Sequence, residues 1–279
     1  MPLVLQNLHT HTTFCDGNNS VDEMCKATLA CGLTSLGFSG HAYTPHDESW
    51  CMKLGNYAAY REAVLAARKA YQGRLEVYLG LEQDYYSIEP GMELDFIIGS
   101  VHYVKKGDEY VLVDETRQDI ENAVNRLYSG DIYAFLEDYY SLVGDVHNKT
   151  KCNIVGHIDL CEKFNRDAKL FDRESPRYKA AYEKAVDKLV SQGMIFEINT
   201  GAMSRGYADV PYPHPEVLKY IAKCGGRVTI SSDSHSIDTV NFMLDEMLEY
   251  AVSCGINGLY ALTSNGFVPI PIDNRQNKI

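Results

Sequence analysis

Imidazole and carboxylate side chains recur in short motifs that lie far apart in this chain. The first motif places His9 and His11 two residues apart, with Asp16 shortly after them. In an extended segment, residues two apart point the same way, so both imidazoles can reach one metal ion. A His-x-His pair alone is more often incidental than metal-binding, so its meaning depends on the other motifs.

Similar residues directly follow other short apolar runs of the sequence. They are His41, Glu82, His102, His157, Asp233 and His235. Short apolar runs are typical of strands buried on both faces of a parallel sheet. In a closed β/α barrel the carboxyl ends of all strands meet at one face, where active sites are built. We therefore expect these side chains to converge when the chain folds.

A mixed set of imidazoles and carboxylates is typical of a catalytic metal centre. The nine expected ligands are His9, His11, Asp16, His41, Glu82, His102, His157, Asp233 and His235. A structural zinc site uses four ligands and favours cysteine. This set instead suits two or three divalent ions such as zinc, manganese or iron. For each histidine alone, an ordinary buried imidazole remains the alternative.

Short apolar runs alternate with helical patterns along the whole chain. The predicted strands are Val4–Leu8, Ser35–Ser39, Leu75–Leu81, Leu94–Ser100, Cys152–Gly156, Met194–Asn199, Arg227–Ser231 and Gly258–Leu262. The predicted helices are Val21–Ala30, Tyr57–Tyr71, Tyr178–Gln192, Pro215–Cys224 and Asp238–Ser253. This alternation implies parallel strands with crossover helices, and seven or eight such units favour a closed α/β barrel.

Residues 111–147 interrupt this alternation. They are rich in tyrosine and acidic residues, and they predict a mostly helical insertion between the fourth and fifth strands. No linker rich in proline, glycine or serine divides the chain. We therefore expect residues 1–279 to form a single barrel domain with this insertion.

The composition of the 279 residues argues against several classes of protein. Hydrophobic residues make up 45% and charged residues 23%, as in ordinary globular proteins. The net charge of −12 and the lack of any Lys/Arg-rich run argue against a nucleic acid or an anionic membrane as partner. No apolar run is long enough to span a bilayer, and the N-terminus does not resemble a signal peptide. We therefore expect the eight cysteines to be reduced thiols of a cytoplasmic protein.

The motifs together resemble the polymerase-and-histidinol-phosphatase (PHP) superfamily. The runs that carry the resemblance are His9-Thr10-His11, Asp16-Gly17, Gly40-His41, Gly80-Leu81-Glu82, Gly99-Ser100-Val101-His102, Gly156-His157 and Ser232-Asp233-Ser234-His235. Their order and spacing match over nearly the whole chain. The run Glu82-Gln83-Asp84-Tyr85, the run from Asp95 to His102 and the tyrosine-rich insertion are most similar to monofunctional histidinol-phosphate phosphatases.

This resemblance implies a distorted (β/α)7 TIM-like barrel that holds three divalent metal ions. The implied ligands of the first ion are His9, His11, Glu82 and Asp233. Glu82 is implied to bridge to a second ion that His102 and His157 complete, and the implied ligands of the third are Asp16, His41 and His235. Gly40 departs from the family pattern, in which an acidic residue more often precedes the histidine, and this departure bears on the affinity for the third ion.

The implied reaction is hydrolysis of L-histidinol phosphate to L-histidinol and phosphate in histidine biosynthesis. A metal-bridging hydroxide is expected to attack phosphorus, with Asp233, His235 and His41 as catalytic residues. Arg166 and Arg205 are expected to bind the phosphate through their two-pronged donors. Acidic residues of the insertion, Asp114 and Glu115, either recognise the cationic end of the substrate or belong to a solvated acidic loop, and the sequence leaves both interpretations open.

Two other functions stay open from the sequence alone. A PHP-type phosphoesterase of this kind can act on another small phosphate ester, such as a nucleotide or a sugar phosphate. The barrel can also serve as a non-catalytic metal-binding module. Under all but this last hypothesis the expected partner is a small phosphate ester, and the sequence does not specify the oligomeric state.

Overall fold

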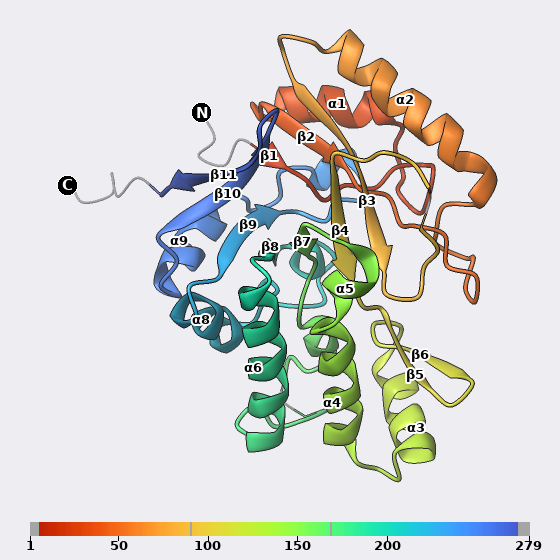
Figure 1. The fold of residues 1–279 in the computed structure, drawn as a ribbon, viewed down its shortest axis with the longest axis vertical. Coiled ribbons are helices and arrows are strands. Elements are labelled where there is room, and N and C mark those ends of the chain that lie inside the picture. The colour runs from red at the N-terminus through yellow and green to blue at the C-terminus, as the bar shows by residue number, and fades with distance from the viewer. Residues whose placement is uncertain (1–5, 90, 168, 273–279) are drawn as a thin grey trace.

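The computed structural model describes residues 6–89, 91–167 and 169–272. Within this described part, seven parallel strands form one sheet in sequence order and curve into a nearly closed barrel (Figure 1). These strands are β1 (Gln6–Asn7), β2 (Ser35–Phe38), β3 (Glu76–Asp84), β4 (Phe96–Ser100), β7 (Ile154–Val155), β8 (Ile195–Asn199) and β9 (Arg227–Ser231). The α/β barrel expected from the sequence is confirmed, with the seven units that the family resemblance implied.

The first and last barrel strands meet just beyond their carboxyl ends. Thr10 and Ser234 form a parallel bridge there. The amide of His11 donates to the carbonyl of Ser234 at 2.8 Å, and the amide of Ser234 donates to the carbonyl of His9 at 3.1 Å. These backbone bonds place the residues that follow β1 beside those that follow β9.

The barrel interior is filled by apolar side chains, and two glycines make room for one of them. A Cβ at Gly80 would lie 2.4 Å from the ring of Phe96, and a Cβ at Gly37 would lie 2.7 Å from it. Protein interiors have little spare volume, so a side chain at either position would force Phe96 to move. Phe96 therefore occupies the barrel interior only because β2 and β3 carry glycine opposite it.

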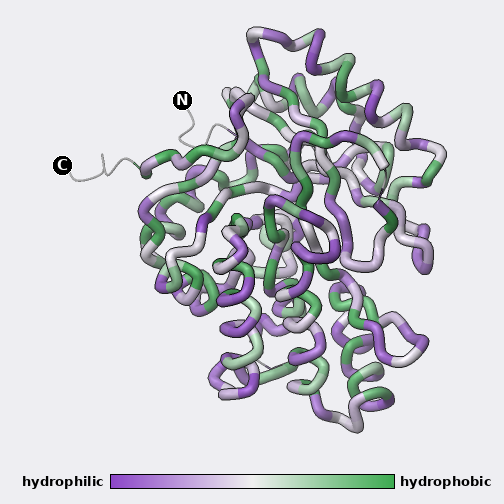
Figure 2. The backbone as a smooth tube through the Cα atoms, viewed as in Figure 1, coloured by the Kyte–Doolittle hydropathy of each residue, from purple (hydrophilic) through white to green (hydrophobic). Residues whose placement is uncertain are grey.

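Helices cover the outside of the barrel. The larger ones are α1 (Val21–Ala30), α2 (Tyr57–Ala70), α6 (Pro176–Ser191), α8 (Pro215–Lys223) and α9 (Glu246–Ser253). Short turns of helix occur at η1 (Leu54–Asn56), η2 (Leu160–Glu162), α7 (Gly201–Ser204) and η3 (Ile237–Thr239). Hydrophobic and hydrophilic residues alternate along α2, as expected for a helix with one face on the barrel (Figure 2). The bounds predicted for the first helix agree with α1, where Ser20 and Glu23 form a capping box.

The chain between β4 and β7 forms a hairpin followed by helices. The hairpin consists of β5 (Tyr103–Lys106) and β6 (Glu109–Leu112), and the helices are α3 (Arg117–Leu127), α4 (Ile132–Val143) and α5 (Val146–Thr150). Figure 1 shows α4 beside α6, where the buried rings of Tyr140 and Tyr178 pack edge to face at 5.8 Å. The tyrosines of this segment thus join it to the barrel helices.

Two predictions near the C-terminus are wrong. The predicted eighth strand is β10 (Gly258–Thr263), but it pairs antiparallel with β11 (Gly266–Pro271) instead of joining the barrel. The predicted helix Asp238–Ser253 begins only at Glu246, because Met243 has a left-handed φ of 53° that interrupts it. The start of the predicted strand Val4–Leu8 lies outside the described residues. In the described chain, no helix has the length and apolar character needed to cross a bilayer.

Candidate metal-dependent active site

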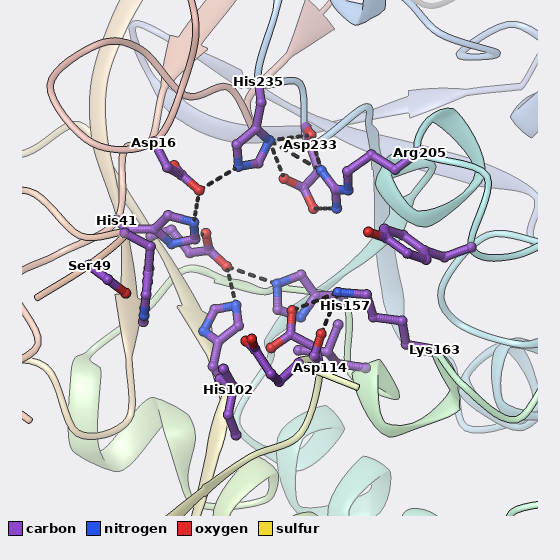
Figure 3. Close-up of a pocket in the computed structure, with 16 residues that line it drawn as sticks. Asp16, His41, Ser49, His102, Asp114, His157, Lys163, Arg205, Asp233 and His235 are labelled. Carbon is purple, nitrogen blue, oxygen red and sulfur yellow. Dashed lines mark hydrogen bonds and ion pairs between the residues drawn. The ribbon is translucent and has the colours of Figure 1, made fainter. Parts of the chain in front are cut away.

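The chemistry-bearing motifs converge at the carboxyl end of the barrel. They border a cavity of about 530 Å³. Figure 3 shows side chains from distant parts of the sequence pointing into this space. The described residues that line it are Asp16, His41, Ser49, Trp50, Glu82, His102, Leu112, Asp114, Glu115, His157, Leu160, Lys163, Arg205, Tyr207, Asp233 and His235. His9 and His11 lie beneath them, fully buried.

Glu82 occupies the centre of the cluster. Its Oε2 atom lies 2.9 Å from Nδ1 of His41 and 3.1 Å from Nε2 of His9. Its Oε1 atom lies 2.8 Å from Nε2 of His157 and 3.6 Å from Nε2 of His102. Burial raises the pKa of Glu82, but the surrounding imidazoles outweigh burial and hold it well below its ordinary value. Glu82 is therefore an anion whose two oxygens face different sets of histidines, as a bridging ligand requires.

Three groups of side chains among the described residues could each hold an ion. In each group the potential ligand atoms lie within 4.8 Å of one another. The groups are His9, His11 and Asp233; His41, Glu82 and His102; and His11, Asp16, His41 and His235. This grouping differs in detail from the partition implied by the family resemblance, since His11 and His41 each belong to two groups. His157, bonded to Glu82, falls within none of them.

The chemistry of these donors fits divalent cations. Nε2 of His9, Nε2 of His11 and Oε2 of Glu82 are buried without a hydrogen-bond partner in the described chain. Buried polar atoms are normally hydrogen-bonded, because leaving one unpaired costs about 1–3 kcal/mol. Three such atoms facing one another, two of them imidazole nitrogens and one a carboxylate oxygen, are what metal ligation would satisfy.

The protonation of His11 agrees with a ligand role. Burial, together with the neighbouring imidazoles of His235 and His41, lowers the pKa of His11 to about 3. The ring is therefore neutral near pH 7, and a neutral imidazole is the form that binds metal. The ring of His235 stacks on it with centroids 4.0 Å apart.

The third group lies nearest to solvent. Oδ2 of Asp16 is 3.2 Å from Nε2 of His235, and Asp16 has 31% of its side chain exposed. A Cβ at Gly40 would lie 3.1 Å from Sγ of Cys15, so a larger residue there would crowd that sulfur. Burial raises the pKa of the Cys15 thiol to about 12. The small residue at position 40 is thus matched to the half-buried Cys15 beside it.

The structure places the two predicted phosphate-binding arginines differently. Arg205 lines the cavity, where Nη2 lies 3.3 Å from Oδ2 of Asp233 and Nη1 lies 3.2 Å from Nδ1 of His235. Arg166 is not among the described residues that line it. Its guanidinium is paired with the exposed Asp209, with Nε 2.5 Å from Oδ2. This pairing places the Arg166 guanidinium away from the cavity, so Arg205 is the one of the two arginines that the described structure offers to a phosphate.

Lys163, which the sequence did not single out as a site residue, enters the cavity in place of Arg166. Its Nζ donates to Asp114, 2.7 Å from the carbonyl and 3.0 Å from Oδ2. Lys163 directly follows the η2 turn, and its contacts with Asp114 hold it at the cavity. Trp50 was missed as well; its ring meets that of His41 edge to face at 4.4 Å and forms an apolar wall. Neither residue has a spacing signal in the sequence.

Two buried carboxylates behind the cluster were also missed. Glu197 contacts His9, and Asp84 contacts His102. Glu197 lies between the apolar residues Phe196 and Ile198 of the buried strand β8, and an acidic residue within such an apolar run is the signal that would have pointed to it.

The barrel and the site define a member of the PHP class. The PHP domain family matches residues 7–201, and the chain belongs to this family. The chain is 30% identical over 252 residues to a probable histidinol-phosphatase of Deinococcus radiodurans, an alignment that covers 84% of this chain and 87% of the relative. It is 25% identical to the histidinol-phosphatase of Bacillus subtilis, with coverage of 86% and 97%.

A solved structure has the same fold. It is histidinol phosphate phosphatase from Lactococcus lactis complexed with zinc, L-histidinol and phosphate. The TM-score is 0.70 at 17% sequence identity, and the match covers 94% of this chain and 98% of that one.

Proposed function

We propose that this protein is a metal-dependent phosphomonoesterase that hydrolyses L-histidinol phosphate to L-histidinol and phosphate in histidine biosynthesis. The observation that carries the proposal is the convergence of nine imidazole and carboxylate side chains at one end of the barrel. Among their donor atoms, Nε2 of His9, Nε2 of His11 and Oε2 of Glu82 are buried without a hydrogen-bond partner in the described residues. Relatives that align over most of the chain are named for this reaction. We further propose that the chain works as a single PHP barrel domain with the insertion at about residues 111–147.

Divalent ions would be held by the nine clustered side chains, with Glu82 between the groups. Zinc, manganese and iron all suit these donors. Bound there, such ions lower the pKa of a water molecule and neutralise charge on the phosphate. Asp233, His235 and His41 are the catalytic residues of this proposal, because each lines the cavity and belongs to a metal-binding group.

Arg205 would bind the phosphate. Its contacts with Asp233 and His235 hold the guanidinium beside the cluster. Burial lowers the pKa of Arg205 but the carboxylate of Asp233 more than compensates, so the group stays cationic. A planar guanidinium can donate two parallel hydrogen bonds to phosphate oxygens, which orients the ester as well as attracting it.

The rest of the cavity suits a leaving group that is cationic. Asp114 and Glu115 line it, and Trp50 and Leu160 add apolar surface. Burial raises the pKa of Asp114, but Lys163 and His102 lower it by more than burial raises it. The pKa therefore lies below its ordinary value and this carboxyl is ionised. Lys163, which also lines the cavity, offsets one of these two carboxylates, and the remaining one complements an ammonium or imidazolium group better than it complements the neutral hydroxyls of a sugar phosphate. This charge favours histidinol phosphate among small phosphate esters.

A cytoplasmic location fits this proposal. The eight cysteines, all within the described part of the chain, are unpaired. Unpaired thiols are typical of a reducing compartment. The proposed partner is the small phosphate ester, without nucleic acid or membrane.

Purified protein tests the proposal directly. Metal content would be measured first, and phosphate release would then be compared for L-histidinol phosphate, a nucleoside monophosphate and a sugar phosphate. We expect at least two equivalents of metal and the highest kcat/KM for L-histidinol phosphate. A higher kcat/KM for another ester would refute the substrate assignment. Less than two equivalents of metal, with no activity after zinc or manganese is added, would refute the enzyme assignment.

A further inference from the structure

Glu197 is a charged residue in β8, a barrel strand whose residues are all buried. Its side chain is 1% exposed, and its neighbours in β8 are buried apolar residues. A carboxylate in such a place is costly unless it is fully hydrogen-bonded and compensated. Its position therefore calls for a role that an apolar residue could not fill.

Both oxygens of Glu197 are used. Oε1 accepts from Nδ1 of His9 at 2.6 Å and from the hydroxyl of Ser231. Oε2 accepts from the amide of His157 at 3.0 Å and from Nδ2 of Asn199 at 2.9 Å. One carboxylate thus connects the residue that follows β1 to the residue that follows β7.

The contact with His9 determines which of its ring nitrogens faces the cluster. A neutral imidazole has one N–H and one lone pair. When His9 binds a metal ion its ring is neutral, and the carboxylate that accepts from Nδ1 then keeps the proton on Nδ1 and leaves the lone pair on Nε2 for the ion. That Nε2 atom is buried, lies 3.1 Å from Oε2 of Glu82 and has no hydrogen-bond partner in the described chain.

The hydrogen bond from His157 to Glu197 takes the place of a backbone hydrogen bond between β7 and β8. The pairing of β7 with β8 covers Ile154–Ile195 and Val155–Phe196 and stops before His157. The amide of His157 is bonded to the side chain of Glu197 instead of to a backbone carbonyl. The place of the His157 backbone therefore depends on this carboxylate.

Asp84 provides a comparison on the other side of the barrel. Its Oδ2 accepts from the amide of His102 at 2.8 Å, as Glu197 does from His157. However, Nδ1 of His102 lies 3.4 Å from Asp84 and makes no hydrogen bond within the described chain. Asp84 thus hydrogen-bonds the backbone amide of His102 but not its ring. Glu197, in contrast, also makes a short hydrogen bond to the ring of a histidine, His9.

We propose that Glu197 is a positioning residue for the metal centre. It holds His9 in the tautomer that can ligate through Nε2. In this way it sets the affinity of the His9–His11–Asp233 group for a divalent ion. This inference rests on the proposed function, since it assumes that these residues bind metal. Carboxylates behind ligating histidines orient the ring and raise its basicity, and their loss typically weakens metal binding about 10- to 100-fold.

The test compares wild-type protein with Glu197→Gln and Ser231→Ala. A glutamine has the same shape, but its amide group presents N–H where His9 or His157 also presents N–H. Ser231→Ala removes a hydrogen bond to the same Oε1 atom and leaves the carboxylate in place. Zinc affinity is measured by competition with a chromogenic chelator, metal content by mass spectrometry after dialysis, and Tm on the metal-free forms.

We expect Glu197→Gln to bind at least one zinc ion about 10- to 100-fold more weakly than wild type, and Ser231→Ala to stay within about threefold. Equal zinc affinity in wild type and Glu197→Gln, or an equal loss in both variants, would overturn the inference while leaving the proposed function intact. Wild-type protein that binds no zinc would refute both.

A measurement on wild type covers the case in which Glu197→Gln does not fold. In zinc-loaded protein labelled with ¹⁵N-histidine, we expect the His9 signal, assigned by its absence in His9→Gln, to show a protonated Nδ1. A protonated Nε2 would contradict the inference, since that nitrogen would then not ligate metal.

Discussion

Replacement of Arg205 tests the proposed phosphate site most directly. Nη1 and Nη2 point toward the cluster, and the side chain is 37% exposed. Two charge-assisted hydrogen bonds to phosphate, partly screened by solvent at this exposure, contribute about 2–3 kcal/mol together. Since about 1.4 kcal/mol is a factor of ten, Arg205→Ala is expected to lower kcat/KM about 30- to 150-fold. Arg205→Lys keeps the charge but not the paired donors, so it should recover only part of this loss.

The assay is phosphate release from L-histidinol phosphate at saturating zinc or manganese. Arg166→Ala is the matched control, because its exposed pair with Asp209 lies outside the cavity and surface pairs contribute little. We expect this control to stay within about twofold of wild type. A kcat/KM for Arg205→Ala within threefold of wild type, or an equal loss in both variants, would refute the assignment of the phosphate site.

Three further predictions concern the metal ions and the barrel. Treatment with a chelator should abolish activity and lower Tm. Zinc added at about 100 times its Kd should then restore about 2.7 kcal/mol of unfolding free energy per site. An unchanged Tm in calorimetry after chelation would argue against bound ions. His9→Ala and Asp233→Ala should each lower kcat more than about 100-fold while far-UV circular dichroism stays native, and near-normal kcat in both would remove their assigned roles. Gly80→Ala should lower the free energy of unfolding in urea by about 1–3 kcal/mol, because its Cβ would lie 2.4 Å from the Phe96 ring. Gly55→Ala, whose Cβ would have nothing within 4 Å, is the control and should change the free energy of unfolding by less than about 0.5 kcal/mol. Equal effects of the two variants would show that the barrel adjusts at Phe96 without loss of stability.

The sequence predicted the barrel because its signals are local. A short apolar run followed by a polar residue is visible over a few positions, and a parallel barrel places all such strand ends at one face. His102 after β4 and Asp233 after β9 were recognised in this way. The eighth predicted strand was wrong for a non-local reason: pairing of Thr10 with Ser234 joins β1 to β9, so β10 finds its partner in β11.

The direction of side chains in the loops could not be predicted from the sequence. Lys163 and Arg166 are three residues apart, yet one meets Asp114 inside the cavity and the other meets Asp209 outside it. Which of the two cations turns inward depends on carboxylates supplied by distant segments, Asp114 for Lys163 and Asp209 for Arg166. No pattern within the loop distinguishes them.

The amino-acid sequence alone determined the kinds of donor, their places at strand ends and the family to which the chain belongs. Only the tertiary structure decided which donors lie close together, because contacts such as that of His157 with Glu82 join residues 75 positions apart. It also decided that Glu197 stands behind His9. The physical reason is that backbone periodicity is set by neighbouring residues, whereas distances between strand ends are set by the closure of the whole barrel.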